Sequence, residues 1–142
     1  MGLLVLYEDN HLIAVKKEPG SIVQSDKTGD ETLAEEVKAY IKRKYKKPGD
    51  VFLGIVHRLD RPVGGVIVFA RTSKALTRMN ELFREKKISK TYWAIVEEKP
   101  PREDGQLVNW LKKNQEKNRS RAYDIEVKES KKAELTYRLM GR

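Results

Sequence analysis

The chain has 142 residues, of which 39% are hydrophobic and 36% charged, with a formal net charge of +9. This balance excludes a disordered tail and favours a single compact domain, because apolar residues are numerous and spread along the chain. The sequence contains no cysteine, only two histidines and no apolar stretch near the roughly 18 residues of a membrane span, which excludes disulfides, a conventional zinc site and a transmembrane helix.

The first predicted elements are two strands of a hairpin. Leu3–Tyr7 is a short apolar run, residues 8–10 are typical of a turn, and His11–Lys17 contains a second apolar group. Pro19 and Gly20 then interrupt the pattern. No basic and apolar leader precedes this hairpin, so we expect a cytoplasmic protein.

A helix is predicted over Thr32–Lys47. Thr32 and Glu35 have the spacing of a capping box, apolar residues recur at helical intervals as far as Ile41, and Pro48 ends the pattern. A second helix is predicted over Ser73–Lys87, where apolar residues share one face and basic residues suit the negative end of the helix dipole.

The other predicted elements are short strands. They span Val51–Val56, Val66–Ala70, Thr91–Val96, Leu107–Leu111, Tyr123–Val127 and Leu135–Met140. Because strands outnumber helices and occur in runs, we expect an α+β fold with a mixed or antiparallel sheet and two flanking helices.

Basic residues are concentrated in two segments. The helical segment Lys38–Lys47 contains no acid, and Lys112–Arg121 contains five basic residues and one acid. Such clusters attract polyanions, because each neutralised phosphate releases counterions, although a solvated lysine-rich surface explains the charge equally well. The candidate RNA contacts are Lys42, Arg43, Lys46, Lys47, Lys112 and Lys113.

The polar segment between the strands at Val51–Val56 and Val66–Ala70 concentrates reactive side chains. It begins His57-Arg58-Leu59-Asp60-Arg61-Pro62 and ends at Gly64-Gly65. A lone string of this kind is usually a β-turn in which the aspartate accepts backbone N–H bonds. No Gly-Lys-Ser or Gly-Lys-Thr follows the glycines, so we interpret them as room for a turn and not as a phosphate loop.

Residues His57 to Thr72, HRLDRPVGGVIVFART, resemble the catalytic signature of the RNA pseudouridine synthases that carry an HRLD box and modify ribosomal and transfer RNA. The opening hairpin with Pro19-Gly20 and the segment Lys90-Thr91-Tyr92 resemble further motifs of this family, and the resemblance covers most of Leu3 to Met140. It implies isomerisation of uridine to pseudouridine in structured RNA by a monomer that needs no cofactor or metal.

The resemblance implies roles that the chemistry of the residues supports. Asp60 matches the essential carboxylate, and an ionised carboxylate can attack carbon without help from a base. Whether it attacks the base or the sugar, or stabilises elimination, stays open. Tyr92 matches the aromatic residue on which the flipped uracil stacks, and Arg58 is expected to fill the vacated space or bind a flanking phosphate. We expect His57 to shape the loop and assign it no chemistry.

The chain departs from the family in two places. Nothing matches the Thr-Gly-Arg-x-His-Gln-Ile-Arg type segment whose basic residue pairs with the carboxylate, and Val63-Gly64 replaces the usual threonine and serine, which bears on substrate preference. We therefore expect residues 1–142 to form the N-terminal and central portion of the catalytic domain. The alternative function is that of a catalytically inactive RNA-binding module derived from this fold.

Overall fold

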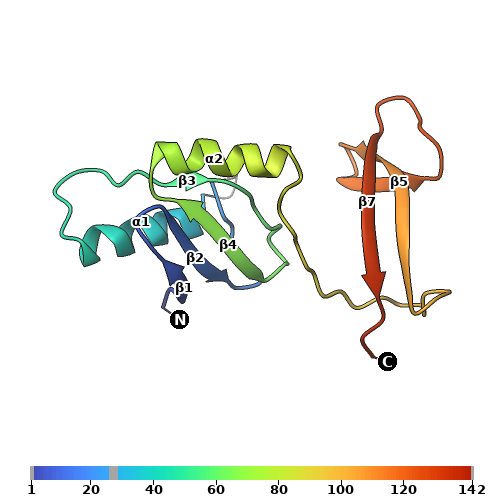
Figure 1. The fold of residues 1–142 in the computed structure, drawn as a ribbon, viewed down its shortest axis with the longest axis horizontal. Helices are drawn as coiled ribbons and strands as arrows, with labels where there is room; N and C mark the ends of the chain where they lie inside the picture. The colour runs from blue at the N-terminus through green and yellow to red at the C-terminus, as the bar shows by residue number, and fades with distance from the viewer. Residues whose placement is uncertain (1, 26–28, 142) are drawn as a thin grey trace. The chain divides into compact units, whose positions relative to one another are not determined.

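A computed structural model describes residues 2–25 and 29–141 and divides the chain into two units, with the boundary between Thr91 and Tyr92 (Figure 1). The first unit contains β1 (Val5–Glu8), β2 (Leu12–Lys17), α1 (Leu33–Lys44), β3 (Gly54–Ile55), β4 (Gly65–Ala70) and α2 (Ser73–Arg84). The second contains β5 (Asp104–Asn114), β6 (Arg119–Tyr123) and β7 (Lys131–Arg138). Within the described ranges, no helix has the length and apolar character needed to cross a membrane.

The first unit is built on an antiparallel sheet with the strand order β1-β2-β4-β3. The expected hairpin is confirmed, since β1 pairs with β2. Asp9 fixes the turn because its carboxylate accepts the backbone N–H groups of His11 and Leu12 at 2.7 and 2.6 Å. The Tyr7 hydroxyl also donates to Asp9, and these hydrogen bonds lower the pKa of Asp9 to about 2.

The capping box at the start of α1 is confirmed. Glu35 donates its backbone N–H to the Thr32 hydroxyl, and the Glu35 carboxylate accepts the Thr32 N–H at 2.8 Å. The predicted end at Lys47 is wrong, because α1 ends at Lys44 and Lys46 takes a left-handed conformation with φ of +47°. Lys47 N–H then bonds to Lys42 C=O at 3.1 Å, which closes the helix as a Schellman motif.

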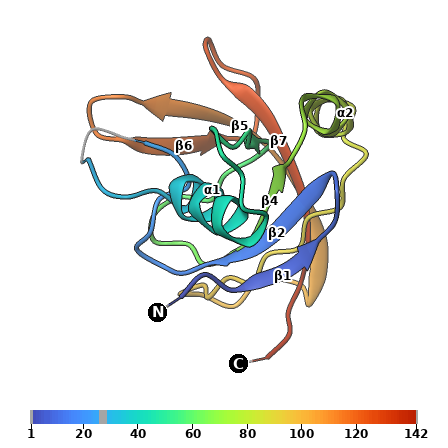
Figure 2. The ribbon, with the colours of Figure 1, turned by 90° about the vertical axis from the view of Figure 1, so that its left-hand side faces the viewer.

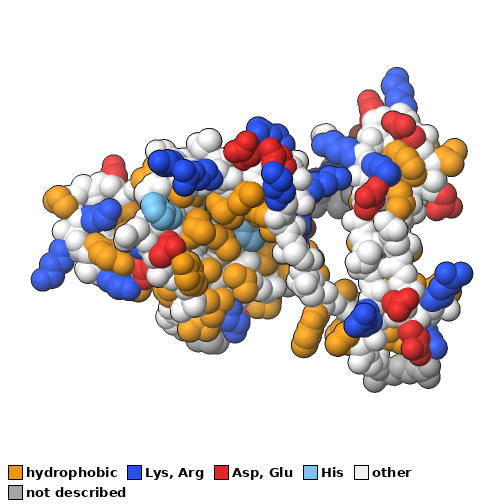
Figure 3. All heavy atoms as spheres, in the orientation of Figure 1, with side chains coloured by type: hydrophobic (Ala, Val, Ile, Leu, Met, Phe, Trp, Pro, Cys, Tyr) orange, Lys and Arg blue, Asp and Glu red, His pale blue; other side chains and the backbone are white. Residues whose placement is uncertain are grey.

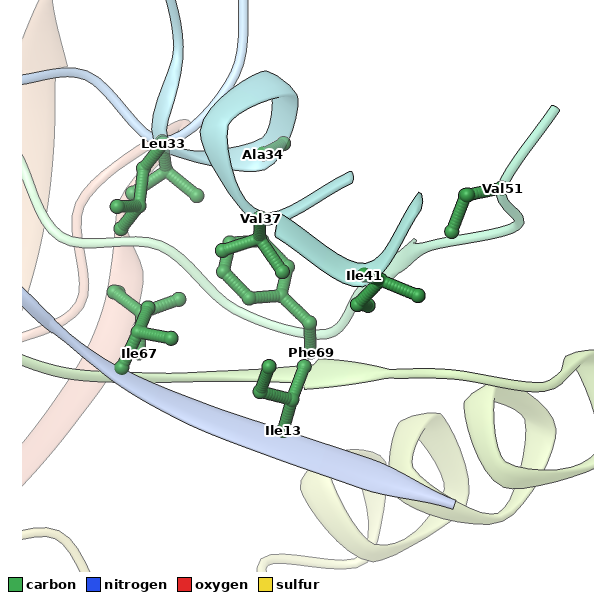
Figure 4. Close-up of a cluster of buried hydrophobic side chains, with 10 residues drawn as sticks. Ile13, Leu33, Ala34, Val37, Ile41, Val51, Ile67 and Phe69 are labelled. Atoms are coloured by element: carbon green, nitrogen blue, oxygen red, sulfur yellow. The ribbon is translucent and has the colours of Figure 1, made fainter. Parts of the chain in front are cut away.

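The core lies between α1 and one face of the first sheet. Ile13, Phe69 and Ile67 point from β2 and β4 toward Val37 and Ile41 on the helix, as Figure 4 shows. Figure 2 shows α1 running across these strands. All five side chains are almost completely buried, so this contact supplies the apolar burial that stabilises the unit.

The second helix packs against β3 and β4 on the opposite face (Figure 4). Its start is confirmed, because the Thr72 hydroxyl accepts the Ala75 N–H at 3.1 Å, but it ends at Arg84 and not at Lys87. Gly54 in β3 allows this packing, since a Cβ there would lie 2.9 Å from the methyl carbons of Leu76. The two helices therefore flank the sheet, as predicted.

The second unit is a three-stranded antiparallel sheet with the order β6-β5-β7. The predicted strands Leu107–Leu111 and Leu135–Met140 overlap the longer β5 and β7. The strand predicted at Tyr123–Val127 is misplaced, because β6 ends at Tyr123 and a turn follows in which Ser130 N–H bonds to Val127 C=O. Most of the basic segment Lys112–Arg121, which lies between two of the predicted strands and is expected to be a loop, is therefore the paired hairpin of β5 and β6.

The strand predicted at Thr91–Val96 is wrong. This segment forms no strand in the structure, and Trp93 and Ile95 in it are 91% and 103% exposed. Strand-forming residue types need a neighbouring strand to satisfy their backbone groups, and none of the described strands pairs with this segment.

Candidate active site around Asp60

The loop between β3 and β4 presents the predicted catalytic residues to solvent. Asp60 and Arg58 are both exposed, and neither forms a hydrogen bond or ion pair with another side chain in the part of the chain that the structure describes. Val63 N–H bonds to Asp60 C=O at 3.0 Å, which makes residues 60–63 a turn. The turn is therefore present, but its bond is to the Asp60 backbone carbonyl, and among the described residues no backbone N–H bonds to the exposed Asp60 carboxylate.

Two glycines, Gly64 and Gly65, lie where the loop joins β4. Gly65, the first residue of β4, has a φ of +148°, a conformation that other residues rarely adopt. A Cβ on Gly64 would lie 3.0 Å from Pro19, so the loop passes close to the turn that follows β2. Both glycines therefore serve the course of the backbone.

Lys17, a buried residue of β2, holds this loop through hydrogen bonds to its backbone. It lies on the same face of β2 as Ile13 and Val15 and is fully buried. Its ammonium group donates to the carbonyl oxygens of Arg61 at 3.1 Å and Val63 at 2.7 Å, and to its neighbour Glu18 at 3.3 Å. The backbone that carries Asp60 is therefore fixed by a buried cation from another strand.

The surroundings of Lys17 also affect its protonation. Burial lowers the pKa of Lys17, and the positive charge of Arg61 lowers it further, whereas the negative charge of Asp60 acts in the opposite direction. Sequence reasoning missed Lys17. Its signal was a lysine at a position where the strand alternation of Ile13 and Val15 requires a buried residue.

Two further contacts hold the ends of the loop. Gly20 N–H donates to the Arg61 carbonyl oxygen at 2.7 Å, so this oxygen accepts bonds from both the Pro19-Gly20 turn and Lys17. The Arg61 guanidinium bonds to the Asp30 carboxylate at 2.8 Å. Arg61 is thus anchored, while Arg58 is exposed to solvent two residues before Asp60.

His57 shapes the start of the loop, as expected. Its Nε2 accepts the backbone N–H of Val68 in β4 at 3.0 Å, so a side chain replaces the strand carbonyl just beyond β3. Its ring also stacks on Phe83 of α2, with 5.4 Å between centroids. Burial, with a smaller effect of the Lys90 charge, lowers the pKa of His57, which agrees with a neutral ring protonated on Nδ1.

The predicted RNA contacts on α1 are exposed. Lys42 and Arg43 lie in its last turn, and Lys46 and Lys47 follow the helix end. Their neighbour Lys44 is different, because it forms an ion pair of 2.7 Å with Glu8. Basic side chains are visible on both units in Figure 3.

Glu8 is the reason why Lys44 is bound to the protein while the neighbouring basic residues are exposed. Its carboxylate also accepts the hydroxyls of Tyr40 and Tyr45 at 3.0 and 2.8 Å and lies 3.2 Å from Arg71. Burial opposes ionisation of Glu8, but the hydrogen bonds from Lys44, Tyr45 and Tyr40 outweigh it and lower its pKa. The carboxylate in turn raises the pKa of Lys44. This network joins α1 to the sheet, so we assign Lys44 a structural role.

The remaining predicted residues lie in the second unit. Tyr92 is the first residue of that unit and is 59% exposed. Lys112 and Lys113 are successive residues of β5, so their side chains point to opposite faces of the sheet. Arg58 and Asp60 share one loop, whereas the role of Tyr92 stays a prediction. Among the described residues, no group of three or more histidine, aspartate and glutamate side chains is placed to hold a metal ion.

Comparison with known proteins identifies the family of this fold and loop. The family model described as RNA pseudouridylate synthase matches residues 11–142, a range that includes Lys17, Asp60 and Tyr92. The chain belongs to the RNA pseudouridylate synthase family. The expected membership of the RNA pseudouridine synthase family is therefore confirmed.

Curated relatives carry the name ribosomal large subunit pseudouridine synthase C. Proteins of this name from Buchnera aphidicola subsp. Acyrthosiphon pisum and subsp. Schizaphis graminum are 35% and 33% identical over 124 and 135 residues. These matches cover 87% and 95% of this chain but only 38% and 41% of the relatives. The Escherichia coli K12 protein of that name is 34% identical over 93 residues, 66% of this chain and 27% of its own length.

A solved structure supports the fold. The human RNA pseudouridylate synthase domain containing 4 protein superimposes with a TM-score of 0.76 and 21% identity, over 95% of this chain and 52% of the other. The α+β fold is thus confirmed. The chain spans about half of that structure and about two fifths or less of the curated relatives it matches.

Proposed function

We propose that the protein isomerises uridine to pseudouridine in structured RNA, with Asp60 as the nucleophile. The observation that carries this proposal is the exposed Asp60 carboxylate on a turn whose backbone is held by the buried Lys17 ammonium. A nucleophile on such a loop is pre-positioned, so little ordering is required when the substrate binds.

The reaction conserves the atoms of the base and needs no electron acceptor. The bond between uracil N1 and the ribose C1′ breaks, the base turns, and a bond between C5 and C1′ forms. The hydrogen of C5 leaves as a proton and N1 gains one. Asp60 supports the separation of base and sugar by adding to one of them or by stabilising elimination, and each route is complete without a cofactor or metal.

Arg58 and Tyr92 serve the substrate in this proposal. Arg58 is two residues before Asp60 and extends into solvent, where it binds a phosphate flanking the target or occupies the space that the uridine leaves. Tyr92 supplies a ring on which the flipped uracil stacks. Transfer and ribosomal RNA are the substrate classes, and the names of the curated relatives favour large-subunit ribosomal RNA.

The test is the replacement Asp60→Asn, which keeps the shape of the side chain and removes its nucleophilicity. Pseudouridine is detected in the RNA by primer extension after carbodiimide treatment, and RNA affinity is measured in parallel. We expect no pseudouridine with Asp60→Asn and an affinity within a few-fold of the parent. Turnover by Asp60→Asn would remove the catalytic assignment, and RNA binding without turnover by the parent would favour the inactive binding module.

A further inference from the structure

The central strand of the second unit carries different chemistry on its two faces. Side chains alternate along β5, so Trp110 and Lys112 lie on one face, and Leu107 and Leu111 lie on the other. Pairing between β5 and its neighbours is continuous over these residues, so the alternation is not interrupted by a bulge. One face of the sheet therefore carries Leu107 and Leu111, and the other combines aromatic and basic groups.

The register extends this second face across all three strands. Trp110 is opposite Tyr123 of β6 and Lys132 of β7, Lys112 is opposite Arg121, and Asn114 is opposite Arg119. Residues directly opposite in an antiparallel pair share a face and contact each other. We call this surface the aromatic-basic face, and it comprises Trp110, Lys112, Arg119, Arg121, Tyr123 and Lys132.

The side chains of this face leave two cations available. Lys112 lies 3.7 Å from Glu129, and Lys132 lies 2.5 Å from Glu134. Arg119 and Arg121 have no carboxylate partner within residues 2–25 and 29–141. They are exposed at the end of the hairpin and carry positive charge that no acid in the described structure neutralises.

Arg121 makes a cation–π contact with the ring of Tyr123 on this face. Its guanidinium carbon lies 5.4 Å from the centroid of the Tyr123 ring. Lys112, Arg119, Arg121 and Tyr123 line a shallow depression of ≈ 590 Å³ beside the hairpin loop. Trp110 and Tyr123 are partly exposed, so part of each ring is accessible to a ligand.

We propose that the aromatic-basic face binds unpaired nucleotides of the RNA. Bases stack on both Tyr123 and Trp110, and Arg119 and Arg121 hold the adjoining phosphates. Paired bases in an A-form helix are covered by their neighbours, so an aromatic surface selects loops, bulges or displaced strands. This inference rests on the proposed function for its RNA partner and adds a second binding surface, away from the Asp60 loop in sequence.

A purely structural role for the two rings predicts a different result. Aromatic residues directly opposite each other also stabilise a sheet without any ligand. In that case replacing either ring lowers the stability of the second unit, while RNA affinity depends only on charge. Fluorescence and affinity measurements on the same variants separate the two roles.

The first experiment uses the emission of Trp110. The chain contains two tryptophans, so Trp93→Phe leaves Trp110 as the single reporter. A short single-stranded oligouridine should quench this emission on binding, whereas an oligonucleotide of equal length without bases should bind by charge and leave it unchanged. Binding of oligouridine with no change in Trp110 emission would overturn the proposal.

The second experiment compares affinities for the same oligouridine at one salt concentration. Tyr123→Leu and Trp110→Leu should each weaken binding about 5- to 150-fold, and Tyr123→Phe and Trp110→Phe should bind nearly as well as the parent, because phenylalanine keeps a stacking surface. Tyr137→Leu is the matched control, since Tyr137 is on the opposite face of the same sheet. Thermal melting of each variant shows whether the fold is retained.

Failure of this binding proposal can be distinguished from failure of the catalytic proposal for Asp60. If the leucine variants bind as tightly as the parent, this proposal fails and the conversion of uridine by the Asp60 loop is unaffected. If the parent forms no pseudouridine but oligouridine quenches Trp110, the nucleotide-binding face stands and the catalytic proposal fails. Equal losses from the leucine and phenylalanine variants would also contradict stacking.

Discussion

The ammonium group of Lys17 lies 2.7 Å from the carbonyl oxygen of Val63, a residue 46 positions later in the chain. The same group bonds to the Arg61 carbonyl oxygen, so one buried cation from β2 fixes both sides of Pro62 on the loop that carries Asp60. The position of Asp60 therefore depends on a residue outside the HRLD segment.

The replacement Lys17→Met should lower the free energy of unfolding by about 1–3 kcal/mol, because the loop carbonyls lose their donor. Urea denaturation monitored by circular dichroism measures this change. The matched control is Lys16→Met, since Lys16 is the exposed neighbour and forms an ion pair with Glu18 on the surface, where such pairs contribute little. Equal stability of the two variants would show that Lys17 does not hold the loop.

His57 should make stability depend on pH. Its pKa is lowered in the folded protein relative to an ordinary value near 6.5, so the unfolded chain binds more protons between these two values. The contribution of His57 is complete above about pH 6.5 and is lost as the pH falls through the folded pKa, because protonated Nε2 cannot accept the Val68 N–H.

Unfolding at pH 7.5 and pH 5.0 measures this effect. The replacement His57→Gln keeps an acceptor and does not titrate, so the parent should lose more stability on acidification than this variant. An identical loss in both proteins would assign the pH dependence to other groups.

Tyr92 should matter for activity and not for stability. Its side chain is 59% exposed, so Tyr92→Ala is expected to change the free energy of unfolding by no more than about 0.5 kcal/mol. Pseudouridine formation should fall strongly with Tyr92→Ala and much less with Tyr92→Phe, which keeps the ring for stacking. If both variants lose activity equally, the hydroxyl group and not the stacking surface explains the residue.

RNA affinity should decrease steeply with salt, because lysine and arginine neutralise phosphates. If about four to six basic residues of α1 and the β5–β6 hairpin take part, log K against log salt should have a slope near −3 to −5, at roughly 0.7–0.9 per contact. Changing Lys42, Arg43, Lys46 and Lys47 together to glutamine should make this slope shallower by about 3.

The control for this titration removes the same charge from α2 and the turn that follows it. It changes Lys74, Arg78, Arg84 and Lys86 to glutamine, all of which are exposed. Both variants are titrated with one hairpin RNA. An equal effect of the two variants would mean that net charge and not the end of α1 governs binding.

The sequence by itself determined the elements that rest on local signals. Asp9 at the turn, the Thr32 and Glu35 capping box and the apolar spacing of the two helices act within three or four residues, so their geometry follows from neighbouring positions alone. The turn after Asp60 is local in the same way, because its hydrogen bond joins Asp60 C=O and Val63 N–H, but the loop backbone around it is also held by the distant Lys17.

Only the tertiary structure decided the features that depend on distant partners. Thr91–Val96 has the composition of a strand but no pairing neighbour, and the hairpin register and not hydrophobicity placed β6 at Arg119–Tyr123. Lys17 is the clearest case, since a lysine in a strand predicts a solvated side chain until carbonyls 44 and 46 residues away supply its hydrogen bonds. Burial and strand pairing are non-local, so they are fixed only when segments far apart in sequence meet.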